Sequence, residues 1–153
     1  MKRLLEKALA LKLKLQGVDS ANIRTSIDTV ATAVQDERPD LRPHAAPDGT
    51  VTILFSDIEA FTALTERLGD QRAHVVLQAH NRIIREQLQR HGGFEVKSHG
   101  DGFMIAFQSA RRALLCAVAV QRALAGYAAE NPEEPIRVRI GLHTGETIKH
   151  RGL

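Results

Sequence analysis

The chain has 153 residues, of which 43% are hydrophobic and 25% are charged, and its formal net charge is +3. These proportions are those of a soluble globular protein with one domain of ordinary size, and no uninterrupted apolar run approaches the ~20 residues that a membrane-spanning helix needs. The single cysteine, Cys116, excludes a disulfide framework and a thiolate zinc site, and it fits a reducing, cytoplasmic compartment.

Residues 1–35 are predicted to form a basic helical arm. Apolar side chains recur at helical spacing, first along one stripe and then along a short heptad seam. They are Leu4, Ala8, Leu11, Leu15, Ile23, Ile27, Val30 and Val34. The surface that this arm packs on stays open between its own domain, a second copy and a membrane, the membrane being the least favoured. The rest of the chain is nearly neutral, which disfavours a nucleic acid partner.

Residues 36–49 contain three of the five prolines and no periodicity, so we predict a Pro-rich linker there. Residues 50–153 then form the predicted domain. Its first segment, VTILFS, is a continuous β-branched and aliphatic run, which is typical of a strand buried on both faces. Two helical patterns follow, separated by Gly69, and His80 falls on the buried side of the second, where we expect a core histidine.

Residues 94–99 alternate in polarity, a glycine-rich turn follows, and the apolar run FMIAF returns as the partner strand, which together predict a β-hairpin. Strict alternation places Glu95, Lys97 and His99 on one face of its first strand. A third helix begins after Ser109, and a last strand alternates over residues 136–142 with Arg139 pointing outward. The order strand, helix, helix, hairpin, helix, strand indicates an α+β sandwich of the ferredoxin-like kind.

Two carboxylates stand where predicted strands end, Asp57 after the first strand and Asp101 in the hairpin turn. Carboxylate oxygens are the ligands that Mg²⁺ prefers, and two divalent ions ~3.5–4 Å apart can activate a hydroxyl and neutralise leaving phosphate oxygens. Taken singly, such residues are more often helix caps or turn residues. Two acids at this spacing therefore predict a cation site without naming a reaction.

Three segments, VTILFSDIEAFTALTERLGD, EVKSHGDGFMIAF and RVRIGLHTGE, resemble in order the catalytic domain of class III adenylyl and guanylyl cyclases. The resemblance covers residues 50–147. It implies a ferredoxin-like palm that dimerises head to tail, as a homodimer or with another cyclase domain. It also implies two divalent cations, Mg²⁺ or Mn²⁺, and conversion of a nucleoside triphosphate to a 3′,5′-cyclic nucleotide and pyrophosphate.

The resemblance also implies roles for individual residues. Asp57 and Asp101 match the metal-binding aspartates, and Ile58 matches the residue that lends a backbone carbonyl to one metal. The substrate-binding positions are Phe61, Thr62, Lys97 and Arg139. Phe61, Thr62 and Arg139 match triphosphate contacts. Lys97 matches the base-reading position of the opposite protomer, and a lysine there favours ATP because it donates to the N1 acceptor of adenine.

Two departures from the family pattern bear on activity. Ala60 replaces the glycine common before the Phe-Thr pair, which restricts φ. No residue can be assigned to the Asn and Arg that the family carries after the third segment, so we expect a C-terminally truncated domain with impaired catalysis and an open sheet edge. The alternative is a non-catalytic, cyclase-like nucleotide-binding or dimerisation module. A diguanylate cyclase is disfavoured because the turn lacks a GG[DE]EF pattern.

Overall fold

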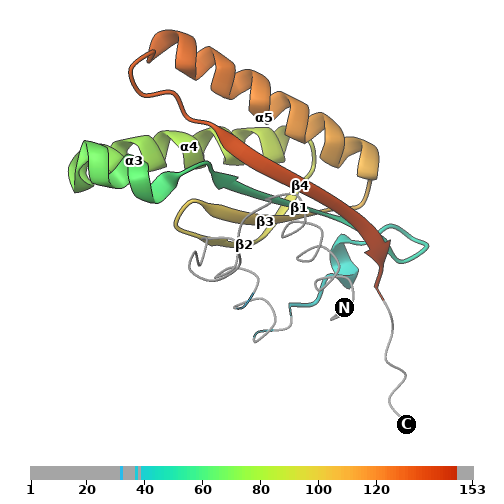
Figure 1. The fold of residues 1–153 in the computed structure, drawn as a ribbon. Helices are drawn as coiled ribbons and strands as arrows, with labels where there is room; N and C mark the ends of the chain where they lie inside the picture. The colour runs from blue at the N-terminus through green and yellow to red at the C-terminus, as the bar shows by residue number, and fades with distance from the viewer. Residues whose placement is uncertain (1–31, 33–36, 38, 148–153) are drawn as a thin grey trace.

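The computed structural model describes Thr32, Glu37 and residues 39–147 (Figure 1). The predicted arm, residues 1–35, lies outside the described residues except for Thr32. The elements are η1 (Arg42–His44), β1 (Thr50–Ile58), α3 (Phe61–Leu68), α4 (Asp70–Arg90), β2 (Phe94–His99), β3 (Gly102–Phe107), α5 (Ala110–Glu130) and β4 (Val138–Glu146). Apart from η1, which falls in the predicted linker, their order is the one that the sequence predicts.

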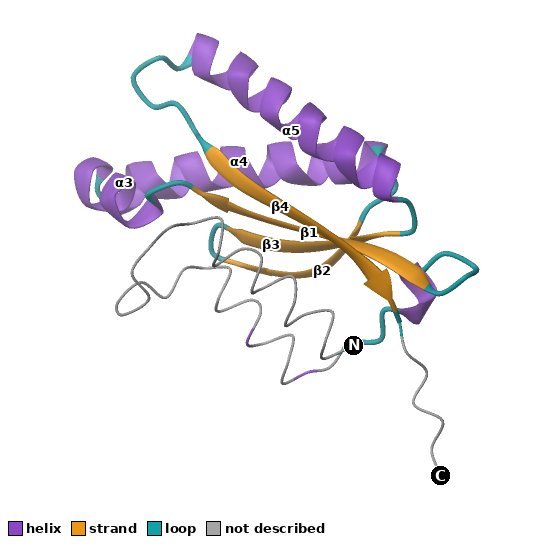
Figure 2. Cartoon of the chain, turned by 45° about the vertical axis from the view of Figure 1, so that its right-hand side comes forward, coloured by secondary structure: helices purple, strands orange, loops and turns teal. Residues whose placement is uncertain are grey.

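The four strands form one antiparallel sheet in the spatial order β2-β3-β1-β4. β3 lies between β1 and β2, the two strands that α3 and α4 connect, which is the split βαβ arrangement of a ferredoxin-like sandwich. Figure 2 shows α4 and α5 on the same side of the sheet. The predicted α+β class is therefore confirmed.

Packing on both faces explains why β1 shows no polar alternation. Every residue of β1 after Thr50 is buried. Leu54 and Ile58 join the core under the helices, whereas Ile53 and Phe55 join a smaller cluster on the opposite side of the sheet, called here the second face. The second-face cluster consists of Leu41, Val51, Ile53, Phe55, Met104 and Ala106. VTILFS is thus a central strand, as its composition predicts.

The residues before β1 contribute to this second face. The predicted linker, residues 36–49, includes the 3₁₀ helix η1, which has a proline in its first turn, where the fixed φ of proline is favourable. Leu41, just before η1, is only 1% exposed and packs with the second-face cluster. The chain between residues 41 and 45 is therefore attached to the sheet by apolar contacts.

α5 is long and apolar enough to meet the length and composition criteria for a membrane-crossing helix. Core helices of globular proteins meet the same criteria. Here Cys116, Val120 and Leu124 pack into the core, and Ser109 caps the helix by accepting a 3.3 Å hydrogen bond from the Arg112 amide. Packing in the domain therefore accounts for the apolar inner face of α5.

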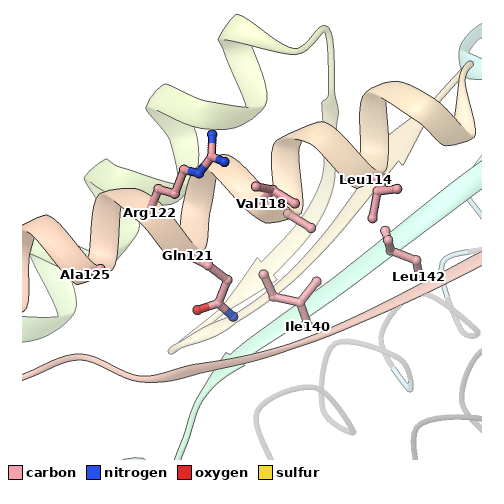
Figure 3. Close-up of a pocket in the computed structure, with 8 residues that line it drawn as sticks. Leu114, Val118, Gln121, Arg122, Ala125, Ile140 and Leu142 are labelled. Carbon is pink, nitrogen blue, oxygen red and sulfur yellow. The ribbon is translucent and has the colours of Figure 1, made fainter.

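A groove of about 510 Å³ lies between α5 and β4. Its lining residues are Leu114, Ala117, Val118, Gln121, Arg122, Ala125, Ile140 and Leu142. Figure 3 shows Ile140 and Leu142 of β4 facing Leu114 and Val118 of α5. Within residues 39–147, β4 pairs only with β1 and forms one edge of the sheet, so the predicted open edge is present in this part of the chain.

Candidate functional site

The two predicted metal-binding aspartates meet at the end of β1. Ser56 of β1 pairs with Phe103 of β3, which places the β2–β3 turn beside the last residues of β1. The Asp101 Oδ2 atom accepts a 2.8 Å hydrogen bond from the Ile58 amide. Asp57 and Asp101 are 1% and 2% exposed. The structure thus brings Asp57, Ile58 and Asp101 into one buried acidic site.

Arg139 joins this site through strand register. It lies opposite Asp57 in the β1–β4 pairing, so the two side chains share a face. The guanidinium donates from Nε to Asp57 Oδ1 at 3.0 Å and from the second terminal nitrogen to Oδ2 at 3.1 Å. Such a bidentate, charge-assisted pair fixes the carboxylate firmly. The sequence predicts Arg139 at this site but not its pairing with Asp57.

Lys97 reaches the second face because β2 contains a bulge. The β2–β3 register runs from Glu95 opposite Ile105 directly to Lys97 opposite Met104, so Val96 is the extra residue. Met104 belongs to the second-face cluster, whereas Ile105 belongs to the core under the helices. The prediction that Lys97 shares a face with Glu95 is therefore wrong, because a bulge shifts the two-residue period by one.

The bulge turns Lys97 toward the face that carries Asp57 and Arg139. Lys97 nevertheless stays apart from the acidic pair, because β3 runs between β2 and β1. Its ammonium group forms an ion pair with Glu37, at 2.5 Å between Nζ and Oε1. The structure thus brings four of the predicted site residues together and places Lys97 on the same face at a distance.

Phe61 and Thr62 begin α3 directly after the acidic site. The Leu64 amide donates to the carbonyl of the N-cap residue Ala60 at 3.0 Å. The Phe61 and Thr62 amides therefore belong to the helix N-terminus, whose amides favour an anion. Ala60 itself adopts left-handed angles, φ 53° and ψ 39°. The family glycine at this position would adopt them without strain.

His80 of α4 packs close to the acidic site and was predicted only as a core residue. It is fully buried, with its ring 5.8 Å from the Phe103 ring and its Nδ1 2.9 Å from the Asn81 side-chain oxygen. Among the described residues its Nε2 has no hydrogen-bond partner. Burial lowers the pKa of the imidazole, against the opposing effects of Asn81, Asp101 and Asp57. The structure confirms the prediction that His80 is buried.

The groove between α5 and β4 is not part of this site. Ile140 and Leu142 line the groove and pack against the core under the helices, whereas Arg139 points to the second face. The groove is also apolar, while the acidic site contains the charged groups. Asp57 and Arg139 therefore lie on the opposite side of the sheet from the groove.

The chain belongs to the family described as the adenylate and guanylate cyclase catalytic domain, which it matches over residues 44–151. Relatives include an adenylate cyclase of Lachancea kluyveri, 40% identical over 114 residues, which are 74% of this chain and 6% of that protein. An adenylate cyclase of Schizosaccharomyces pombe is 36% identical over 115 residues, 73% of this chain and 7% of that protein.

Solved structures agree with this assignment. A bacterial light-regulated adenylyl cyclase superposes with a TM-score of 0.60 at 28% identity, covering 65% of this chain and 55% of that one. Adenylate cyclases of Trypanosoma brucei in their monomeric state include one with a TM-score of 0.56 at 28% identity, covering 65% and 58%. The chain therefore spans little more than half of these solved chains and a small part of the curated relatives.

Proposed function

We propose that this chain provides the metal- and triphosphate-binding part of an adenylyl cyclase domain, which converts ATP to 3′,5′-cyclic AMP and pyrophosphate at a dimer interface. The meeting of Asp57 and Asp101 at the end of β1, fixed by the 2.8 Å bond from the Ile58 amide, carries this proposal. Membership of the cyclase catalytic-domain family and the adenylate cyclase names of its relatives support it.

The acidic site fits a divalent cation by its donor set. Two carboxylates and the Ile58 carbonyl are oxygen ligands, which Mg²⁺ and similar ions prefer. Asp57 and Asp101 are almost wholly buried, and Arg139 and the Ile58 amide already bind them. A cation between the two carboxylates would further offset the cost of burying two neighbouring charges. Within the described residues no group of three or more His, Cys, Asp or Glu side chains forms a metal cluster, so water and substrate phosphates would complete the ligand shell.

A bound Mg²⁺ or Mn²⁺ would supply Lewis-acid stabilisation of phosphate charge and lower the pKa of the attacking hydroxyl. The protein's own residues would bind and orient the substrate. Arg139 would exchange Asp57 for a phosphate, and the amides of Phe61 and Thr62 would face the triphosphate. Lys97 of the opposite protomer would donate to adenine N1.

The proposed reaction forms one bond and breaks one. The ribose 3′-oxygen bonds to the α-phosphorus, the bond from that phosphorus to the pyrophosphate oxygen breaks, and the 3′-hydroxyl proton is released. The strand register and the helix N-terminus hold these protein groups in place. The residues would therefore contribute by orienting the substrate for this displacement.

A second candidate is a cyclase-like module that binds nucleotide or dimerises without turnover. The bidentate pair of Arg139 with Asp57 favours this module. Turnover would need Arg139 for phosphate and Asp57 for the metal, and here the two side chains bind each other. Asp57 and Asp101 are both present, which favours metal binding but does not by itself supply turnover.

Thermal unfolding with Mn²⁺ and ATP tests the proposal. A ligand at a hundred times its dissociation constant stabilises the folded state by about 2.7 kcal/mol, so a clear shift is expected with Mn²⁺ and ATP and none with ATP and EDTA. ATP should stabilise more than GTP. Cyclic AMP formed in the same samples, even at a low rate, would identify the enzyme. No response to Mn²⁺ and ATP would contradict nucleotide binding in either form.

A further inference from the structure

Glu37 and Lys97 are 60 residues apart in the sequence, yet their side chains form a 2.5 Å ion pair. Lys97 is 30% exposed and Glu37 is 59% exposed, so the pair lies at the surface of the second face. The carboxylate therefore sits on the ammonium group that, under the proposed function, would read the base of ATP.

Residues 41–44 are attached to the same face. Leu41 is 1% exposed and packs with the second-face cluster of β1 and β3. His44 stacks on Phe94 of β2, with ring centroids 3.6 Å apart and an interplanar angle of 10°. These contacts fasten residues 41–44 to the face on which Lys97 lies.

We propose that Glu37 masks Lys97 and so works as an autoinhibitory contact on base recognition. This inference rests on the proposed function, because it assigns regulation to the same site. An ammonium group held by a carboxylate must give up or share that partner before it donates to adenine N1. The negative charge of Glu37 also opposes the approach of a triphosphate.

The strength of the pair indicates a modest, reversible mask. Exposed ion pairs contribute about 0.2–1 kcal/mol, because solvent and salt screen them. The apparent affinity for nucleotide falls in proportion to the fraction of unmasked lysine, so such a pair weakens binding about two- to sixfold. A movement of residue 37 away from the sheet would release Lys97 while Leu41 and His44 stay in place.

The test compares Glu37→Gln with Asp40→Asn. Both remove one negative charge from the same segment, but the Asp40 carboxylate binds Arg42, at 2.7 and 2.6 Å, and not Lys97. The measurement is the dissociation constant of a fluorescent ATP analogue with Mn²⁺, using the full chain. Glu37→Gln should bind about two- to sixfold more tightly than the wild-type chain, and Asp40→Asn should match the wild type. In a Lys97→Met background, Glu37→Gln should change nothing.

A second measurement is independent of nucleotide. The rate at which acetic anhydride modifies Lys97, followed by mass spectrometry, should rise in Glu37→Gln and stay unchanged in Asp40→Asn. An unchanged rate of Lys97 modification in Glu37→Gln, or equal effects of both substitutions on nucleotide binding, overturns the proposed mask but leaves the proposed function standing. Weaker nucleotide binding by Glu37→Gln also overturns it, since Glu37 would then assist recognition. Absence of binding in the wild type and in Glu37→Gln contradicts both the mask and the proposed function.

Discussion

Arg139 donates two hydrogen bonds to Asp57, at 3.0 and 3.1 Å, and so joins a predicted phosphate-binding residue to a predicted metal-binding residue. The Asp57 side chain is 1% exposed, whereas that of Arg139 is 38% exposed. If Arg139 leaves, a buried carboxylate loses its charged partner, which is costly unless a cation replaces it. Cation binding at Asp57 and release of Arg139 toward phosphate should therefore be coupled.

Arg139→Gln tests this coupling. Without metal it should lower the free energy of unfolding by about 1–3 kcal/mol, because a buried acceptor loses its charged donor. Mn²⁺ should restore part of the loss. Urea unfolding with EDTA and with Mn²⁺ measures both effects, and Arg137→Gln, an exposed arginine beside β4, is the matched control. Equal stability of Arg139→Gln and Arg137→Gln in EDTA would show that the pair contributes nothing.

Ala60→Gly should stabilise the fold by about 1 kcal/mol. A non-glycine residue in the left-handed region costs about 1–2 kcal/mol, and part of the gain from removing that cost is lost because glycine gives the unfolded chain more conformational entropy. Gly69→Ala is the opposite substitution, at a φ of 76° between α3 and α4, and should destabilise. Chemical denaturation of both variants measures whether the free energy of unfolding rises or falls in each. A destabilised Ala60→Gly would mean that the left-handed angles at Ala60 are not strained.

The buried imidazole of His80 should make stability depend on pH. Burial lowers its folded pKa below the ordinary value of 6.5, so as the pH falls through 6.5 the unfolded chain takes up the proton first. Stability should then be lost toward acid, by at most about 1.4 kcal/mol per pH unit for one group. Urea unfolding between pH 5 and 8 measures how the free energy of unfolding changes with pH. That change should be smaller for His80→Gln than for the exposed-site control His74→Gln. Equal slopes would exclude His80 as the cause.

The alkylation rate of Cys116 should distinguish the folded chain from the unfolded chain. It is 1% exposed, and burial raises the pKa of its thiol to about 11. Because thiolate is the reactive form, alkylation at pH 8 should be at least about a hundredfold slower in the native chain than in urea. Mass spectrometry after timed iodoacetamide labelling measures the ratio. Comparable native and denatured rates would contradict burial of this thiol.

Local patterns in the sequence were sufficient to predict most of the fold. Gly69 ends α3, Ser109 caps α5, and the continuous apolar run of β1 is a central strand, because each signal depends on neighbouring residues only. The positions of Asp57 and Asp101 at strand ends follow from the same signals. Their meeting depends on β1 pairing with β3, which the ferredoxin-like order predicts.

The remaining site contacts depend on non-local pairing. The bulge at Val96 arises in the register of β2 against β3, and a strict two-residue period places Lys97 on the wrong face. The Arg139–Asp57 pair requires the register of β4 against β1. The Glu37–Lys97 pair requires the residues before β1 to pack on the second face. No local signal in the sequence carries these three relationships.

The central claim is that Asp57 and Asp101 hold a divalent cation for a nucleoside triphosphate. Calorimetric titration of Mn²⁺, with a non-hydrolysable ATP analogue present, tests it on the wild-type chain, Asp57→Asn, Asp101→Asn and Asp70→Asn, whose exposed carboxylate begins α4. The account predicts binding to the wild type and Asp70→Asn, and at least about tenfold weaker binding to the two site variants, a loss of ~1.4 kcal/mol or more. Equal Mn²⁺ affinity in all four chains would contradict it.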